Sequence, residues 1–300
     1  MSPFALLLVV IAAFAHAAWN LASKRASATG LPFIFLGAAA SAVLWMPVAA
    51  ADAVVNGLEP APFLLGAGVS AVVHLGYMHV LQRGYAHGDM SVVYPMARGT
   101  GPLLSVVLAI VLFGEHPSAL ALAGAAIVVA GIVGIGLSTG GRPRRARGAA
   151  GAAGGRPAGS SRAGVVYGLL TGCMIAAYTL WDAFTVTELG VSPVAFMVGC
   201  TFGEVVLLVP LLRRCRAEVA RVWRGFRRQV LVVGVLSPLS YILVLTAMQH
   251  APVSLVAPAR ELSVVLVSLA AWLLLKEPRP LQRMAGAVVV LGGVALLAIA

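Results

Sequence analysis

Long apolar runs alternate with short polar connections along the whole chain. Each run approaches the roughly 20 residues that a helix needs to cross the hydrocarbon of a bilayer. The runs are apolar on all sides rather than at every second position, which favours helices over the strands of a membrane barrel. The pattern predicts an all-α polytopic membrane protein with ten transmembrane helices, at about 4–22, 31–50, 62–82, 90–113, 118–138, 163–185, 191–212, 229–249, 253–275 and 281–299.

The second half of the chain repeats landmarks of the first half at a constant spacing. The pairs are Trp19 and Trp181, Gly37 and Gly199, Arg98 and Arg260, Glu115 and Glu277, Gly124 and Gly286, and Gly131 and Gly293. Each copy has five apolar runs, and because five is odd, the second copy enters the membrane from the opposite side. This predicts two inverted five-helix repeats, 1–138 and 163–300, an arrangement typical of secondary transporters. Residues 139–162, rich in Gly, Ala, Arg and Pro, are predicted to be a flexible basic linker.

The first run also resembles the core of a signal peptide, with a small-x-small cleavage site at Ala15-His16-Ala17. The basic region that precedes such a core is missing, and Trp19-Asn20 has a counterpart in Trp181-Asp182. We therefore expect this run to be retained as the first helix.

Composition and charge support the membrane class and predict an orientation. Hydrophobic residues make up 60% of the chain and charged residues 10%, with a net charge of +11. Apart from Arg98 and Arg260, the Lys and Arg residues lie in the odd-numbered connections, whereas the even ones hold acids such as Asp52 and Glu59. The positive-inside rule then places both termini outside a cytoplasmic membrane. The basic stretches are read as topology signals, with contact to anionic lipid as the alternative. A nucleic-acid partner is not expected.

No pattern of a metal, disulfide or nucleotide site is found. Cys173, Cys200 and Cys215 form no CxxC pair and are predicted to be packing residues. His74 and His79 lie five residues apart, which is not the i, i+4 spacing of a metal pair on one helix face. The linker has no GxxxxGK[ST] motif. We therefore expect neither a metal nor a cofactor.

Short motifs carry a family resemblance. The segments AAWNLASK and TLWDAFTV share a small-x-Trp pattern, and Glu115 and Glu277 are each followed nine residues later by a glycine. The chain resembles the ten-helix EamA-type transporters of the drug/metabolite transporter superfamily. That resemblance implies transport of a small polar metabolite through a cavity between the first, third, fourth, sixth, eighth and ninth helices. It also implies both termini in the cytoplasm, opposite to the charge bias. The HAAWNLASK segment resembles a subgroup associated with phosphonate utilisation, which implies an anionic solute.

Two arginines lie inside apolar runs, where an unpaired charge is costly and usually faces a cavity or a partner. Arg98 and Arg260 each lie roughly 10 Å from the end at which their own helix begins, on opposite sides, so both can approach one central cavity. Each follows a proline, Pro95 or Pro258, whose missing N–H loosens the helix. Arg98 is predicted to clamp a carboxylate or phosphonate through its planar fork. The alternative is an ion pair.

The intramembrane acids are candidates for proton coupling or charge compensation. Glu204 has Ala42 as its repeat counterpart, so a carboxylate has been added in one copy only. It is a candidate proton carrier, or a partner for Arg98. Glu261 is the alternative partner for Arg98, and the favoured partner for its neighbour Arg260. Asp182 is expected to be interfacial, near the outer end of its helix.

Aromatic and polar residues in the same helices are further candidates for the substrate site. Trp19 and Trp181 either anchor helix ends in the aromatic belt, which is favoured, or form a cavity wall. His16 shares a helix face with the residue four positions on, and one tyrosine precedes Arg98 by one turn. The predicted substrate-binding set is Arg98, Tyr94, His16, Asn20, Trp19, Tyr77, Tyr241 and Trp181.

The sequence thus predicts a solute transporter that works by alternating access, with a small-molecule solute and membrane lipid as partners. Its oligomeric state is open, with a homodimer as one alternative. An integral membrane enzyme is a second class, although HExxH and GxSxG are absent. A non-transporting scaffold or sensor is a third.

Overall fold

A computed structural model describes residues 1–24, 26, 29–88, 90–139, 161–213, 215–275 and 280–300. The predicted linker and Glu277 lie outside these residues, apart from the linker's two ends. All ten predicted segments are helical, and the ninth is divided into two helices. The helices are α1 (Pro3–Ser23), α2 (Leu31–Asn56), α3 (Pro60–His87), α4 (Met90–Phe113), α5 (Ala119–Thr139), α6 (Ser161–Thr187), α7 (Pro193–Leu212), α8 (Arg216–Met248), α9 (Val253–Ala259), α10 (Leu262–Leu275) and α11 (Pro280–Ile299).

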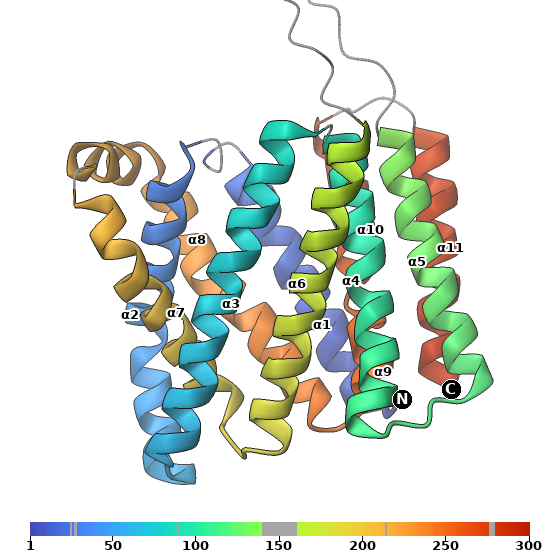
Figure 1. Cartoon of the computed structure of the whole chain (residues 1–300), viewed down its shortest axis with the longest axis horizontal. Coiled ribbons are helices and arrows are strands. Elements are labelled where there is room, and N and C mark those ends of the chain that lie inside the picture. Colours follow the sequence, from blue (N-terminus) through green and yellow to red (C-terminus); the bar gives the residue numbers. More distant parts are fainter. Residues whose placement is uncertain (25, 27–28, 89, 140–160, 214, 276–279) are drawn as a thin grey trace, which may run out of the picture.

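The helices stand side by side as a single bundle (Figure 1). Within the described residues, eight stretches are long and apolar enough to cross a membrane, one of them formed jointly by α9 and α10. Shorter apolar stretches lie in α5 (Ala119–Ile135) and in α11 (Met284–Ile299). Large apolar side chains such as Val43, Leu64 and Val111 are exposed on the outside of the bundle. Such a surface is suited to lipid rather than to water.

Helix packing has the symmetry of an inverted repeat. Helix α1 packs on α8, as its counterpart α6 packs on α3, and α2 packs on α8, as α7 packs on α3. The pairs α2–α7 and α5–α11 each join an element to its own counterpart. Exchanging the two halves therefore leaves this contact pattern unchanged, which is the result expected of a pseudo-two-fold axis.

The α5–α11 contact is made by the duplicated glycines. A Cβ on Gly131 would lie 2.9 Å from the backbone nitrogen of Val290, and a Cβ on Gly293 would lie 2.8 Å from the carbonyl oxygen of Gly124. A Cβ on Gly286 would lie 3.2 Å from the carbonyl oxygen of Gly131. The backbones approach too closely for larger residues, as in small-xxx-small helix pairs.

Helix α8 begins earlier than the sequence predicted. Residues 216–228 were assigned to a basic connection, yet α8 starts at Arg216 and is interrupted at Phe226, where the backbone leaves helical geometry (φ −132°, ψ 21°). The stretch before Phe226 is polar and basic, with buried Val222 and half-exposed Trp223. Hydropathy alone predicts a loop for such a stretch, but a basic stretch with some apolar residues can fold as a helix at the membrane surface.

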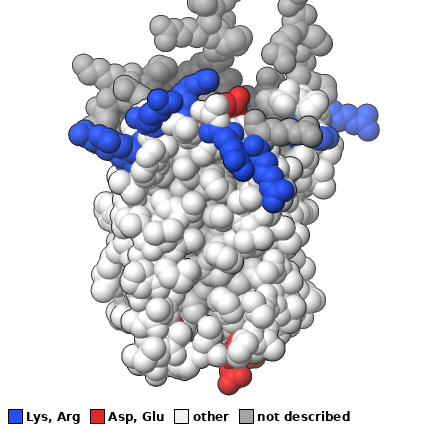
Figure 2. Space-filling model, turned by 90° about the vertical axis from the view of Figure 1, so that its left-hand side faces the viewer, with Lys and Arg blue, Asp and Glu red and all other residues white. Residues whose placement is uncertain are grey.

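The two ends of the bundle differ in charge. Lys and Arg side chains gather at the end where α5 finishes and α6 begins, and the opposite end carries Asp and Glu (Figure 2). Both termini lie at this opposite end, where the N-terminal ammonium group lies 3.4 Å from the carbonyl oxygen of Ala298 (Figure 1). The predicted separation of basic and acidic connections is thus present in the structure, and the orientation in the membrane remains a prediction.

Candidate functional site

A cavity of 380 Å³ lies between the two repeats. Its walls combine apolar side chains with His, Tyr, Arg, Glu and Ser side chains. They come from α1, α2, α3, α4, α6, α7, α8, α10 and the α9–α10 turn. The expected set of lining helices was therefore incomplete, because α2 and α7 also line the cavity. Small residues such as Gly37, Ala38 and Ser41 on α2 leave room for it.

Two guanidinium groups and one carboxylate form the basic wall of this cavity. Arg98 on α4 places Nη1 3.4 Å from both carboxylate oxygens of Glu261. Arg260 places Nε 3.7 Å from Oε1 of Glu261, and donates from Nη2 to the hydroxyl of Thr179 at 3.1 Å. The Glu261 side chain is 1% exposed, whereas that of Arg98 is 21% exposed. The carboxylate is thus shared by two arginines, and Arg98 retains a surface towards the cavity.

Aromatic rings lie beneath both guanidinium groups. The Arg98 guanidinium carbon lies 5.8 Å from the centre of the Tyr94 ring, and that of Arg260 lies 5.9 Å from the Tyr178 ring. Such cation–π contacts add to the ion pairs and restrict where each guanidinium can point.

The arginine and the glutamate of the second repeat lie at the interruption between α9 and α10. Glu261 N donates to the carbonyl of Pro258, and Ser263 N donates to that of Arg260. These are i to i−3 bonds, so the helix tightens to 3₁₀ geometry after Pro258. The sequence predicted loosening at both Pro95 and Pro258. Only the second copy is interrupted within the described residues, since α4 runs through Pro95 and Pro102.

A carboxylate from the other repeat fixes the start of the short helix α9. Glu115, in the loop after α4, accepts from the backbone nitrogen of Val253 at 2.6 Å and from that of Ser254 at 2.9 Å. These N–H groups have no partner inside α9, and the N-terminal end of a helix favours negative charge.

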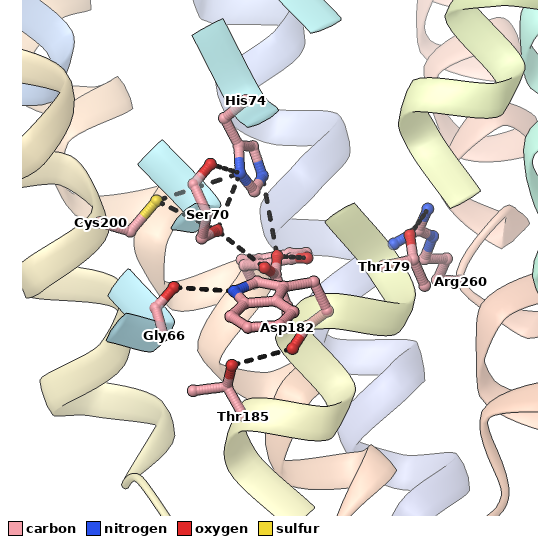
Figure 3. A network of polar contacts seen from close by, with 10 residues as sticks. Gly66, Ser70, His74, Thr179, Asp182, Thr185, Cys200 and Arg260 are labelled. Atoms are coloured by element: carbon pink, nitrogen blue, oxygen red, sulfur yellow. Dashed lines mark hydrogen bonds and ion pairs between the residues drawn. The ribbon is translucent and has the colours of Figure 1, made fainter. Parts of the chain in front are cut away.

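A second polar group lies behind the cavity wall (Figure 3). Asp182 on α6 is fully buried and accepts hydrogen bonds from the hydroxyls of Ser70, at 2.7 Å, and of Tyr241, at 2.5 Å. His74 places Nε2 3.9 Å from Asp182, and its ring stacks on Tyr178 with centroids 4.3 Å apart. Asp182 is enclosed within the bundle, because α3 and α8 cover this face of α6 and supply donors for its carboxylate.

The structure places five of the eight predicted substrate residues in the cavity wall and three outside it. Trp181 donates to the carbonyl of Gly66 on α3, and the Asn20 amide donates to the carbonyl of His16 in its own helix; neither lines the cavity. Tyr94 lies under Arg98 rather than in the wall. The predicted residues that do line the cavity are His16, Trp19, Tyr77, Arg98, Glu204, Tyr241 and Glu261.

Trp19 points its indole N–H to a position without an acceptor in the described residues. His16 meets the Trp19 ring edge to face, with centroids 5.0 Å apart. A buried donor without a partner is costly, so an indole that lines a cavity is suited to bind a solute or water.

Sequence reasoning gave too little weight to Arg260, His74, Ser70 and Cys200. Arg260 was assigned to local pairing, and it also lines the cavity. Ser70 and His74 are four residues apart on one face of α3, a spacing that was available as a signal. Cys200 lies 3.5 Å from the Ser70 hydroxyl, a contact between α3 and α7 that spacing along one helix does not indicate.

Comparison with protein-family models identifies both repeats. The model of the EamA-like transporter family matches residues 3–137 and again residues 162–299. The chain belongs to the EamA-like transporter family. The predicted membership is therefore confirmed, and with it the membrane-transporter class.

Solved structures share the fold of this EamA-like chain, and one of them is a crystal structure of a protein. The two are 16% identical, and the alignment covers 100% of this chain and 98% of the other, with a TM-score of 0.68. At this identity the likeness concerns the fold alone. A search of curated proteins gave no match.

Proposed function

We propose that this EamA-like protein is a secondary transporter that moves a small anionic or zwitterionic metabolite across the cytoplasmic membrane by alternating access. The observation that carries the proposal is the shared use of Glu261 by Arg98 and Arg260 in the wall of the cavity. At Glu261, two guanidinium groups share one carboxylate, so one positive charge has no carboxylate of its own in contact. A carboxylate, phosphate or phosphonate on the solute would balance it.

Arg98 is the proposed anion-binding residue. It contacts Glu261 through Nη1 at 3.4 Å, a long ion pair that leaves other donors of the guanidinium fork for a solute. Its side chain is the more exposed of the two arginines, at 21% against 11%. Arg260, held by Thr179 and Glu261, is the proposed positioning partner.

Glu204 is the proposed counter-charge for a cationic group. It lines the cavity from α7 and receives no hydrogen bond from any described residue. An amino group of a zwitterionic solute could bind there while the acidic group of the solute binds Arg98. The Trp19 indole is a further donor in the same cavity.

The α9–α10 interruption supports alternating access. Arg260 and Glu261 are the two residues between the helices, so a change in the angle between α9 and α10 would move the ion pairs themselves. Broken helices beside a central site are the usual gating elements of secondary transporters.

Ligand-dependent thermal unfolding of the purified protein in detergent tests the anion site. The panel consists of amino acids, phosphonates, sugar phosphates and amines. A ligand at 100 times its Kd stabilises the folded state by about 2.7 kcal/mol, which raises the Tm. We expect at least one anionic or zwitterionic compound to raise the Tm of the wild type and to be taken up by proteoliposomes.

Arg98→Lys is the informative variant, because it keeps a positive charge beside Glu261 but loses the planar fork. Arg83→Lys, at an exposed arginine on α3, is the matched control. The ligand-induced shift should be lost in Arg98→Lys and kept in Arg83→Lys. Equal shifts in all three proteins, or stabilisation by amines alone, would contradict the anion site.

A further inference from the structure

A mixed set of metal-ligand side chains lies where α3 meets α7. His74, Cys200 and Glu204 each offer one ligand atom, and these atoms all lie within 4.8 Å of one another. Cys200 and Glu204 are one turn apart on the same face of α7, and His74 approaches them from α3, with Nδ1 4.0 Å from the Cys200 sulfur. We propose that His74, Cys200 and Glu204 bind a transition-metal ion, with Zn²⁺ as the best fit.

The donor set selects the class of ion. Imidazole nitrogen, thiolate sulfur and carboxylate oxygen are the three ligand types of protein zinc sites, whereas Mg²⁺ and Ca²⁺ favour oxygen alone. Ligand atoms around a tetrahedral zinc ion lie roughly 3.5 Å apart. The observed spread of up to 4.8 Å is wider than this, so metal binding requires the three ligand atoms to move closer together.

The surroundings of His74 are those of a metal-binding histidine. Such residues usually donate their second ring N–H to a carbonyl or carboxylate, which orients the ring. Nδ1 of His74 lies 3.0 Å from the carbonyl oxygen of Ser70, and Nε2 lies 3.9 Å from Asp182 (Figure 3). Nδ1 is the nitrogen beside the Cys200 sulfur, so it would bind the ion, and Nε2 would face the Asp182 carboxylate.

Glu204 and the repeat symmetry give independent support. Glu204 lines the cavity and has no hydrogen bond from the described residues, so its carboxylate is available as a ligand. With the spacing of the duplicated landmarks, the counterparts of His74, Cys200 and Glu204 are Leu236, Ala38 and Ala42. All three ligand types are therefore found in one copy only, at positions where the other copy is apolar.

Three protein ligands leave one coordination position of a tetrahedral ion free, as in zinc sites that exchange their fourth ligand. Glu204 and His74 line the cavity, so this position would be open to water or solute. On binding, the Cys200 thiol loses its proton to solvent and the sulfur forms the bond to the metal. Affinity should therefore rise with pH. The proposal does not depend on transport, and a bound ion would take the place of the solute amino group at Glu204.

Cobalt substitution tests the site in the full-length protein, purified without a polyhistidine tag and treated with a chelator. Co²⁺ bound to a thiolate absorbs in the near ultraviolet by sulfur-to-metal charge transfer, and added Zn²⁺ should abolish this band. We expect the wild type to bind one Co²⁺ per chain and to show the charge-transfer band. We also expect Zn²⁺ to raise the Tm of the wild type.

Cys200→Ser should lose the charge-transfer band, and Glu204→Gln should keep the band while Zn²⁺ affinity falls at least about 10-fold. Cys173→Ser, at the exposed cysteine of α6, is the control and should match the wild type. Tm values measured without metal show whether the variants are folded. If Cys200→Ser is not folded, the Zn²⁺ affinity of Glu204→Gln alone tests the site. No band in the wild type, a band kept in Cys200→Ser, or unchanged affinity in Glu204→Gln would overturn the proposal.

Discussion

Two buried carboxylates of this bundle, Glu261 and Asp182, have partners on other helices. Glu261 forms an ion pair with Arg98 of the other repeat. Asp182 on α6 accepts hydrogen bonds from Ser70 on α3 and Tyr241 on α8. A buried charge without such partners would cost several kcal/mol. These side chains therefore hold the two repeats in register as well as forming the cavity wall.

Glu115 is the clearest case of a single side chain with a structural role. Its carboxylate binds two backbone N–H groups at the start of α9. Glu115→Gln replaces one acceptor by a donor and removes the charge that the helix N-terminus favours. We expect the free energy of unfolding to fall by about 1–2 kcal/mol, measured as a lower Tm in detergent. Glu188→Gln, at an exposed residue of the α6–α7 loop, should change it little, and an equal loss in both variants would contradict the capping role.

At the scale of the helix, the two copies of one sequence pattern have different structures. Pro95 lies within the continuous helix α4, whereas the helix that contains Pro258 is interrupted after Ala259. In contrast, the glycines of α5 and α11 form a contact that is alike in both copies. The elements proposed to move during transport, α9 and α10, are thus different from α5 and α11, which form the close contact between the repeats.

The α5–α11 contact predicts opposite effects for two glycines of one helix. Gly131→Ala places a Cβ 2.6 Å from Cγ2 and 2.9 Å from the backbone nitrogen of Val290, so α11 would have to move away. We expect a loss of about 1–3 kcal/mol in unfolding free energy. A Cβ on Gly134 meets nothing within 4 Å, so Gly134→Ala should leave stability unchanged or raise it slightly. Thermal unfolding of both variants tests this, and equal losses would count against the close contact.

For the whole molecule, the charge distribution predicts an orientation in the membrane. The basic end carries the end of α5 and the start of α6, and both termini lie at the other end (Figures 1 and 2). The positive-inside rule places the basic end in the cytoplasm. Resemblance to transporters with cytoplasmic termini implies the reverse orientation. A measurement of the orientation therefore shows which of the two predictions holds.

Reporter fusions decide between the two orientations. If the charge bias determines insertion, alkaline phosphatase fused after Ala300 should be active, and a fluorescent protein at the same site should be dark. Fusions placed after Thr139 should show the opposite pattern. A fluorescent C-terminal fusion together with an active phosphatase after Thr139 would reverse the orientation and leave the duplicated fold intact.

The sequence by itself determined the number of membrane segments, the duplication and the family. These properties depend on hydrophobic length and on residues repeated at a constant spacing, both of which can be read along one dimension. It also identified Arg98, Glu204 and Glu261 as candidates, since a charge inside an apolar run is costly wherever it lies. Tertiary structure alone decided the partners: Glu261 shared by two arginines, Asp182 covered by α3 and α8, and Cys200 beside His74. The physical reason is that such pairs lie on different helices, and the spacing of residues along one helix does not encode the distance to another.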